Sequence, residues 1–241
     1  MLPRFFVPDL AARAAEARLP EDEARHLTRV LRLGEGDEVA VFDGRGHEFR
    51  ARVVEADRER VRVALVEPLV PALEAHIPLT LVQAILKGDK MDDVVRDATM
   101  MGVAAIEPIV SARTIAKRQA VDRWERVAVS SAKQCRRAVV PRVAPVRSVP
   151  EWLAGSSSEL KLLLVEPTAS GGTERSMRDL LGRTPASVAV IVGPEGGWTA
   201  EERDQMIAAG CTPVTLGALT LRADAVPLVA IAMARFALAD L

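Results

Sequence analysis

Two short glycine-containing segments near the C-terminus hold the residues best suited to chemistry. The first is Ile191-Val192-Gly193-Pro194-Glu195-Gly196-Gly197-Trp198-Thr199, and the second runs from Val214 to Asp224. Each begins as an apolar, β-branched run, breaks at glycine and is followed by a helical pattern. Glycine permits positive φ angles and close approach of a ligand, so free N–H groups in such loops can bind an anion or a base edge. The two segments predict a backbone-lined pocket at the carboxyl edge of an α/β sheet.

The residue types around these glycines favour a neutral ring over a triphosphate as the ligand. The first segment lacks the Gly-Lys-Ser/Thr ending of a Walker A loop, and it is not a G-x-G-x-x-G dinucleotide motif. The second places Leu216, Leu219 and Leu221 beside Gly217, and apolar walls with backbone donors suit an adenine ring. The alternatives are a tight turn without a ligand for the first segment and a surface salt bridge for the following Arg-x-Asp pair.

Alternating strands and helices are expected to position both segments. Glycine at position 102 predicts the end of one helix, and Thr199-Ala200-Glu201-Glu202 forms a capping box that opens another. Strands that alternate with helices imply parallel βαβ units. The predicted strands are 78–86, 103–110, 160–165, 187–192 and 213–216, and the predicted helices are 91–101, 121–137, one from 199 and 224–238.

The N-terminal part of the chain has a different pattern. Residues 39–42, 49–54 and 61–66 read as strands with a hairpin turn at Asp43-Gly44, and a helix is predicted from about Glu21 to Leu31. Several short strands in so few residues suggest a small β-barrel. The prolines in Glu67–Pro71 indicate a linker. We therefore expect two domains, a barrel over residues 1–70 and an α/β domain over residues 74–241.

Charge is unevenly distributed along the 241 residues, although the net charge is only −1. The segment 111–147 has a net charge of +8, which is the footprint of a phosphate-backbone binder, with a solvated helix face as the alternative. Its ten basic residues are Arg113, Lys117, Arg118, Arg123, Arg126, Lys133, Arg136, Arg137, Arg142 and Arg147.

Other function classes are disfavoured by composition. No apolar run reaches the ~18 residues needed to span a bilayer, and the N-terminus does not resemble a signal peptide. Cys135 and Cys211 are isolated, and the chain has three histidines, so we expect no metal site. Unpaired cysteines suit a reducing, cytoplasmic setting.

Across essentially its whole length the sequence resembles the RsmE family of ribosomal RNA uridine-N3 methyltransferases, of the SPOUT class. The resemblance lies in Arg4-Phe5-Phe6, in His26-Leu27 with Arg29-Val30-Leu31-Arg32, in Gly36-Asp37, and in Phe42-Asp43-Gly44. It continues in Lys87-Gly88-Asp89-Lys90-Met91, in Gly193 to Gly197, and in Leu216-Gly217 with Leu221-Arg222. It implies a PUA-like N-terminal barrel, an α/β domain with a deep trefoil knot, S-adenosylmethionine as methyl donor, and a homodimer.

The resemblance also implies roles for individual residues. It implies that the cofactor contacts Leu164, Glu166, Gly193, Pro194, Glu195, Gly196, Gly197, Leu216, Gly217, Leu219 and Leu221. With the basic stretch, it suggests RNA contacts from Arg4, Arg29, Arg32, Lys87, Lys90, Arg113, Lys133, Gln134, Arg136 and Arg137. The barrel and the basic stretch would hold 16S ribosomal RNA, either free or in an assembled particle.

The expected catalytic pair is Arg222 and Asp224. Uridine N3 must lose its proton before it attacks a methyl group, and the permanently cationic Arg222 is expected to stabilise the negative charge on O2 and O4. The base is Asp224, Glu195 or a water. The second motif departs from the family pattern, because Ala218 and Leu219 replace Pro and Arg, and Asp224 replaces Glu. A methyltransferase acting on a ribose 2′-oxygen and a non-catalytic RNA-binding assembly factor remain alternatives.

Overall fold

The computed structural model describes residues 2–11, 14–57, 60–115, 120–167 and 175–240. The chain forms two compact units, one of Met1–Glu74 with Val129–Val140, the other of Ala75–Ala128 with Pro141–Leu241. A short segment of the predicted α/β domain therefore belongs to the N-terminal unit.

The N-terminal unit is built on a five-stranded sheet in the order β1-β3-β4-β5-β2. Its pairs are antiparallel except for β1 and β3. The core holds alternate side chains of these strands, among them Val39, Val41, Val61 and Val63. The strands are β1 (Arg4–Phe6), β2 (Glu16–Arg18), β3 (Glu38–Phe42), β4 (Glu48–Asp57) and β5 (Arg60–Pro68).

Two predictions for this unit need correction. The helix expected from Glu21 to Leu31 is α-helical only in α1 (Glu21–Arg25) and continues as a π-helical segment, His26–Val30. The linker predicted at Glu67–Pro71 begins too early, because β5 runs to Pro68, which lies opposite Phe49. Proline is tolerated there because it ends the strand.

The second unit contains an eight-stranded sheet in which every pairing is parallel. The strands follow the order β11-β13-β10-β12-β6-β7-β8, and β9 also pairs with β7. The strands are β6 (Leu79–Ala84), β7 (Ala105–Val110), β8 (Arg142–Val143), β9 (Arg147–Ser148), β10 (Leu160–Leu164), β11 (Arg175–Ser176), β12 (Val188–Val192) and β13 (Thr212–Thr215). The prediction of parallel βαβ units is confirmed.

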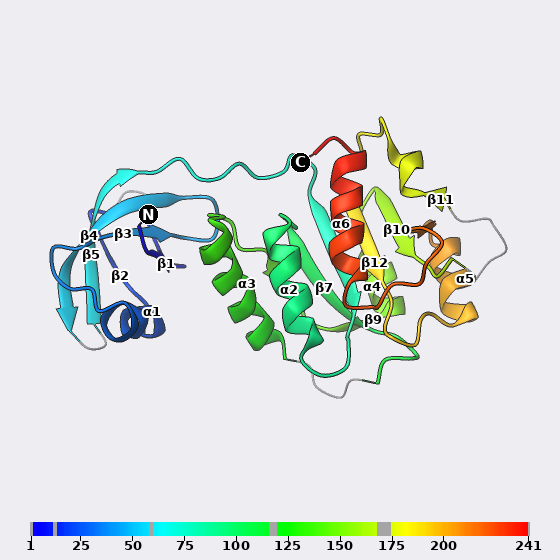
Figure 1. Ribbon diagram of the computed structural model, residues 1–241, viewed down its shortest axis with the longest axis horizontal. Coiled ribbons are helices and arrows are strands. Elements are labelled where there is room, and N and C mark those ends of the chain that lie inside the picture. The colour runs from blue at the N-terminus through cyan, green and yellow to red at the C-terminus, as the bar shows by residue number, and fades with distance from the viewer. Residues whose placement is uncertain (1, 12–13, 58–59, 116–119, 168–174, 241) are drawn as a thin grey trace. The chain divides into compact units, whose positions relative to one another are not determined.

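Helices cover both faces of this sheet (Figure 1). Trp152 and Met206, from two of these helices, share a core with Leu163 and Ile191. Because strand side chains alternate, Val190 points to the other face, where α6 packs along β12 and β6 and contacts α2. The helices of this unit are α2 (Lys90–Met100), α4 (Val149–Gly155), α5 (Ala200–Ala208) and α6 (Val226–Ala237). Helix α3 (Val121–Cys135) begins in this unit, and its residues from Val129 onward belong to the N-terminal unit.

Local sequence explains several helix ends. The Thr199 side chain accepts a hydrogen bond from the Glu202 N–H, and the Glu202 carboxylate accepts one from the Thr199 N–H, so the predicted capping box is confirmed. Gly102 follows α2 with φ +79°, as its predicted role as a helix stop requires. Helix α4 was not predicted, although Ser148 and Glu151 form a capping box at its start.

Candidate functional site

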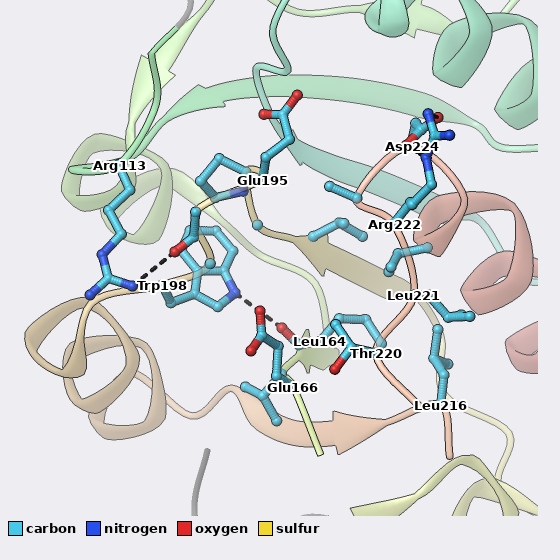
Figure 2. A pocket seen from close by; sticks show the side chains of 18 of the residues that line it. Arg113, Leu164, Glu166, Glu195, Trp198, Leu216, Thr220, Leu221, Arg222 and Asp224 are labelled. Atoms are coloured by element: carbon cyan, nitrogen blue, oxygen red, sulfur yellow. Dashed lines mark hydrogen bonds and ion pairs between the residues drawn. The ribbon is translucent and has the colours of Figure 1, made fainter. Parts of the chain in front are cut away.

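A cavity of about 560 Å³ opens at the carboxyl ends of β10, β12 and β13, within the size range of small-molecule sites. Figure 2 shows that the loops after these strands supply most of its wall. The two glycine segments therefore lie around one cavity. Predicted residues that line it are Lys90, Arg113, Leu164, Glu166, Gly193, Pro194, Glu195, Gly196, Gly197, Leu216, Leu219, Leu221, Arg222 and Asp224. Gly217, with φ +127°, is not among the lining residues.

The start of the first loop is packed against an indole ring. A Cβ added to Gly193 would lie 3.1 Å from Cε2 of Trp198, which explains the glycine. The Trp198 Nε1–H donates to the backbone oxygen of Leu164 at 3.0 Å, so the ring joins the loops after β10 and β12 (Figure 2). The prediction of site residues omitted Trp198, although it directly follows the glycine pair.

An arginine from another loop holds the middle of the segment. Arg113 Nη1 donates to the carbonyl oxygen of Gly196 at 2.8 Å, and a Cβ on Gly196 would lie 3.2 Å from Arg113 Cβ. Gly197 has φ +68°, and its missing Cβ would face the Glu166 carboxylate at 3.5 Å. Arg113 was predicted only as an RNA contact, and the structure also places it in the wall of the cavity (Figure 2).

Glu195 is bound by the loop before α2. Its Oε1 accepts hydrogen bonds from the Lys87 backbone N–H and from Lys90 Nζ, both at 3.1 Å. Partial burial alone would raise the pKa of Glu195. Hydrogen bonds from its own N–H, from Lys90 and from the Lys87 N–H outweigh it, so the pKa lies below the usual range. The carboxylate is ionised at neutral pH, and it is a weaker base than an unpaired glutamate.

The Arg222 and Asp224 side chains form a bidentate ion pair at the rim of the cavity. Arg222 Nε donates to Oδ1 at 3.1 Å and Nη2 to Oδ2 at 2.9 Å. The hydrogen bond from Arg222 is the largest influence on Asp224 and holds the pKa of that carboxyl below its usual range. Arg222 is 77% exposed and Asp224 24% exposed. The guanidinium is thus positioned by its neighbour but remains open to a ligand.

Apolar side chains at the same rim are unusually exposed. Leu219 is 81% exposed and Leu221 is 38% exposed, although both line the cavity. Surface leucines beside a cavity with polar backbone are typical of a wall that a ligand covers.

Some of the residues predicted to bind RNA are held by carboxylates or backbone oxygens, and others are exposed. Arg4 donates to Glu48 and to the backbone oxygens of residues 132, 133 and 137. Lys133 donates to both carboxylate oxygens of Glu23, and the buried Arg137 pairs with Glu74. These three side chains therefore help to hold the N-terminal unit together. The exposed members are Arg29, Arg32, Lys87, Arg113, Gln134 and Arg136.

The basic stretch is not a single free surface. Arg123 pairs with Asp89 and Asp92, while Arg142 and Arg147 share Glu107. Acids distant in sequence thus offset much of the counted charge. Lys117 and Arg118 lie outside the described residues.

Within the ranges given above, no group of three or more His, Cys, Asp or Glu side chains is arranged to hold a metal ion. Over the same ranges, no helix combines the length and the apolar character needed to cross a bilayer.

Two family models match the chain. The model described as an RNA methyltransferase domain matches residues 73–235, and the model described as an RNA methyltransferase PUA domain matches residues 19–66. A curated relative from Synechocystis sp., named ribosomal RNA small subunit methyltransferase E, is 32% identical over 220 residues. That match covers 90% of this chain and 72% of the relative.

Solved structures are similar over nearly the whole chain. A ribosomal RNA small subunit methyltransferase E from Neisseria gonorrhoeae, bound to S-adenosyl methionine, has 32% identity and a TM-score of 0.87, with 98% of each chain covered. A putative methyltransferase from Legionella pneumophila, in complex with the same cofactor, has 26% identity and a TM-score of 0.89, again with 98% of each chain covered.

Proposed function

Because the chain belongs to the ribosomal RNA small subunit methyltransferase E family, we propose that it methylates N3 of a uridine in 16S ribosomal RNA, using S-adenosylmethionine. Membership of this family identifies the chain as an RNA methyltransferase. The choice of uridine N3 as the target atom is our proposal. The observation that carries it is the cavity at the ends of β10, β12 and β13, with an exposed guanidinium at its rim.

The cavity suits the cofactor. Leu164, Leu216 and Leu219 offer apolar contact to an adenine ring. The glycines at 193 and 196 leave room for Trp198 and Arg113 to pack against the loop that forms the cavity wall. When bound, S-adenosylmethionine supplies an electrophilic methyl group. The protein then has mainly to position donor and acceptor. We assign cofactor contacts to the predicted residues that line the cavity, and give Gly217 a role in shaping the loop.

Arg222 is proposed to stabilise the deprotonated uracil ring of the substrate. When N3 of uridine loses its proton, negative charge spreads onto O2 and O4, and a fixed cation favours that state. Asp224 orients the guanidinium through two hydrogen bonds. Asp224 and Glu195 both have pKa values below their usual range, so either acts as a weak base here. Transfer of the N3 proton to a water molecule, and from it to one of these carboxylates, is the third route.

RNA contact is assigned to exposed side chains. We propose that the PUA-like domain, residues 1–70, contributes Arg29 and Arg32, and that Gln134 and Arg136 act beside it, because all four are exposed. The α/β domain, residues 74–241, contributes Lys87 and Arg113 near the cavity. Phosphate contacts of this kind position the RNA without reading its sequence, and the target base must leave its stack to reach the cavity.

We further propose that the α/β domain is knotted and that the protein is a cytoplasmic homodimer. The segment after β13 leads into α6, which packs against the turn Met177–Leu180 between β10 and β12, an arrangement compatible with a trefoil knot. Helix α6 also carries an apolar surface, with Phe236 72% exposed and Leu228 38% exposed. We propose that these two side chains contact a second copy of the chain.

The test combines methyl transfer with cofactor binding. Small ribosomal subunits that lack the modification are incubated with labelled S-adenosylmethionine, and the modified nucleoside is identified by mass spectrometry. We expect 3-methyluridine from the wild type. Arg222→Ala should abolish transfer while cofactor affinity, measured by calorimetry, changes less than about twofold. Arg183→Ala, which removes another exposed arginine of the same unit, is the control.

Three results contradict the proposal in different ways. A 2′-O-methylated nucleoside would assign the enzyme to another RNA atom. The absence of cofactor binding would indicate a non-catalytic RNA-binding factor. Unaltered turnover in Arg222→Ala would refute the role of that arginine alone.

A further inference from the structure

A second cavity, of about 470 Å³, lies in the α/β unit away from the cofactor site. It is lined by Arg142, Arg147, Thr80 and the hydroxyl-bearing loop Ser156-Ser157-Ser158, together with Glu107. The serine loop precedes β10, whereas Leu164, in the cofactor cavity, ends β10. The two cavities share no lining residue and are separated along the sheet by about the length of β10, roughly 13 Å.

The cationic groups of this cavity are held in place by one carboxylate. Glu107 accepts hydrogen bonds from Arg142 Nη2 at 3.1 Å, Arg147 Nη2 at 2.9 Å and Trp152 Nε1 at 2.7 Å. Two arginines against one glutamate leave a net charge of +1. Gly155 also matters here, because a Cβ at that position would lie 3.1 Å from Arg147 Nη1.

Both arginines keep donors for a ligand. A guanidinium has five N–H groups, and each arginine uses one nitrogen, Nη2, in its bond to Glu107. Arg142 is 65% exposed and Arg147 is 31% exposed. Arginine donors combined with serine hydroxyls are the chemistry that recognises phosphate oxygens.

We propose that this cavity binds a backbone phosphate of the RNA substrate, apart from the target base. The inference rests on the proposed function, since it takes the ligand to be that RNA. The volume admits a phosphate with its attached sugar. None of the described residues that line the cavity is aromatic, so it offers no ring for base stacking. The contact is therefore to the backbone and is independent of sequence.

Three variants of the full-length protein test the cavity. Filter binding with a radiolabelled transcript of small-subunit ribosomal RNA gives the affinity between about 50 and 200 mM salt. We expect Arg142→Gln to weaken binding roughly threefold to tenfold and to reduce the slope of log K against log salt by about 1. Arg147→Gln should do the same. Glu107→Gln should tighten binding, because it removes the only carboxylate among the described lining residues.

The opposite signs of these effects separate a phosphate site from a structural ion-pair cluster. If the cluster is only structural, Glu107→Gln lowers stability and does not strengthen RNA binding, which overturns the proposal. Arg96→Gln is the matched control, because Arg96 is also half-exposed and paired with acids, Asp93 and Asp97. Equal weakening by this control, or no weakening by Arg142→Gln and Arg147→Gln, also overturns it.

Two additional measurements keep the result distinct from the proposed function. Cofactor affinity should be unchanged in all three variants. RNA binding is measured without methyl transfer, so an inactive wild type that still binds RNA through Arg142 would refute the methylation and leave the cavity assigned. Inorganic phosphate is titrated separately by NMR. Phosphate binding that depends on Arg142, with unchanged RNA affinity, would mark a site for free phosphate and refute the RNA contact.

Discussion

The buried ion pair between Arg235 and Asp240 makes a sharp prediction about the stability of the α/β unit. Both side chains are at most 3% exposed. Arg235 also donates to the backbone oxygens of Ile77 and Gly102, at 2.7 and 2.8 Å. Asp240 accepts from the N–H groups of His76 and Ile77, at 2.7 and 3.0 Å. The pair thus joins the end of the chain after α6 to the segment before β6.

Asp240→Asn should cost about 3–5 kcal/mol of the free energy of unfolding. The substitution leaves a buried guanidinium without its counter-charge, which is the expensive way to break such a pair. An asparagine also presents an NH₂ group where one of two backbone donors needs an acceptor. For a unit of roughly 150 residues, this loss lowers Tm by about 10 °C.

The contacts of this ion pair also predict how replacing both residues changes the free energy of unfolding. Replacing a buried ion pair by apolar residues is often neutral or stabilising. Here the pair satisfies four backbone groups, two N–H and two C=O, and each unsatisfied buried group costs about 1–3 kcal/mol. Arg235→Met combined with Asp240→Leu should therefore be less stable than Asp240→Asn.

Urea unfolding followed by tryptophan fluorescence measures this loss. All three tryptophans, Trp124, Trp152 and Trp198, belong to the α/β unit, so the signal reports that unit. Asp93→Asn is the control, because the Asp93–Arg96 pair is about half-exposed and its loss should cost less than about 1 kcal/mol. The reasoning is wrong if Asp240→Asn costs no more than this control, or if the double variant is more stable than Asp240→Asn.

Three further predictions concern the cofactor, pH and assembly. Gly193→Ala should displace the Trp198 ring from its hydrogen bond to Leu164 and weaken cofactor binding about tenfold, the equivalent of one hydrogen bond. Calorimetry measures the affinity, and Gly34→Ala is the control because its added Cβ meets open space. Equal cofactor affinities in the two variants would refute the prediction. Burial of Asp43 opposes ionisation, but hydrogen bonds from His47 and from the Arg45 and His47 N–H groups prevail and lower its pKa. Its contribution to stability is therefore present above the unfolded-state pKa of about 3.9 and is lost as pH falls through the lower folded-state pKa. Hydrogen exchange in β3 and β4 should show wild type more protected than Asp43→Asn at neutral pH and the difference vanishing at low pH; a constant difference would contradict it. Phe236→Glu should convert a dimer to a monomer in light scattering, and an unchanged mass would exclude α6 from the interface.

Local sequence predicted the elements whose patterns are long or capped. The apolar runs that became β6, β7, β10 and β12 are recognisable because buried parallel strands are nearly continuous in apolar residues. The strands β8, β9 and β11 have two residues each, too few for any period. Strand β1 pairs with β3 in a register that joins Arg4 to Ala40, 36 residues further along the chain, and that contact leaves no trace in a local pattern.

The site was predictable where its contacts follow a local motif. The glycine segments were found because each marks the end of a strand. Trp198 and Arg113 were not assigned to the cavity wall, because their bonds to Leu164 and Gly196 cross 34 and 83 positions of sequence. The count of basic residues overestimated the free positive charge for the same reason. Lys133 forms an ion pair with Glu23 and Arg137 forms one with Glu74, and both acids lie far away in sequence.

In a protein of net charge −1, solvent exposure determines which arginine side chains can bind RNA phosphates. Arg4, Arg137 and Arg235 are at most 7% exposed and are held by carboxylates, so replacing them should affect RNA binding only through loss of the fold. Arg142 and Arg222 are 65% and 77% exposed, and each is oriented by an acid that leaves donors available. The cations assigned to RNA above include Arg142 and Arg147 beside the exposed Arg29, Arg32, Lys87, Arg113 and Arg136, so several phosphates would be neutralised at once. The affinity for RNA should therefore fall steeply as the salt concentration rises.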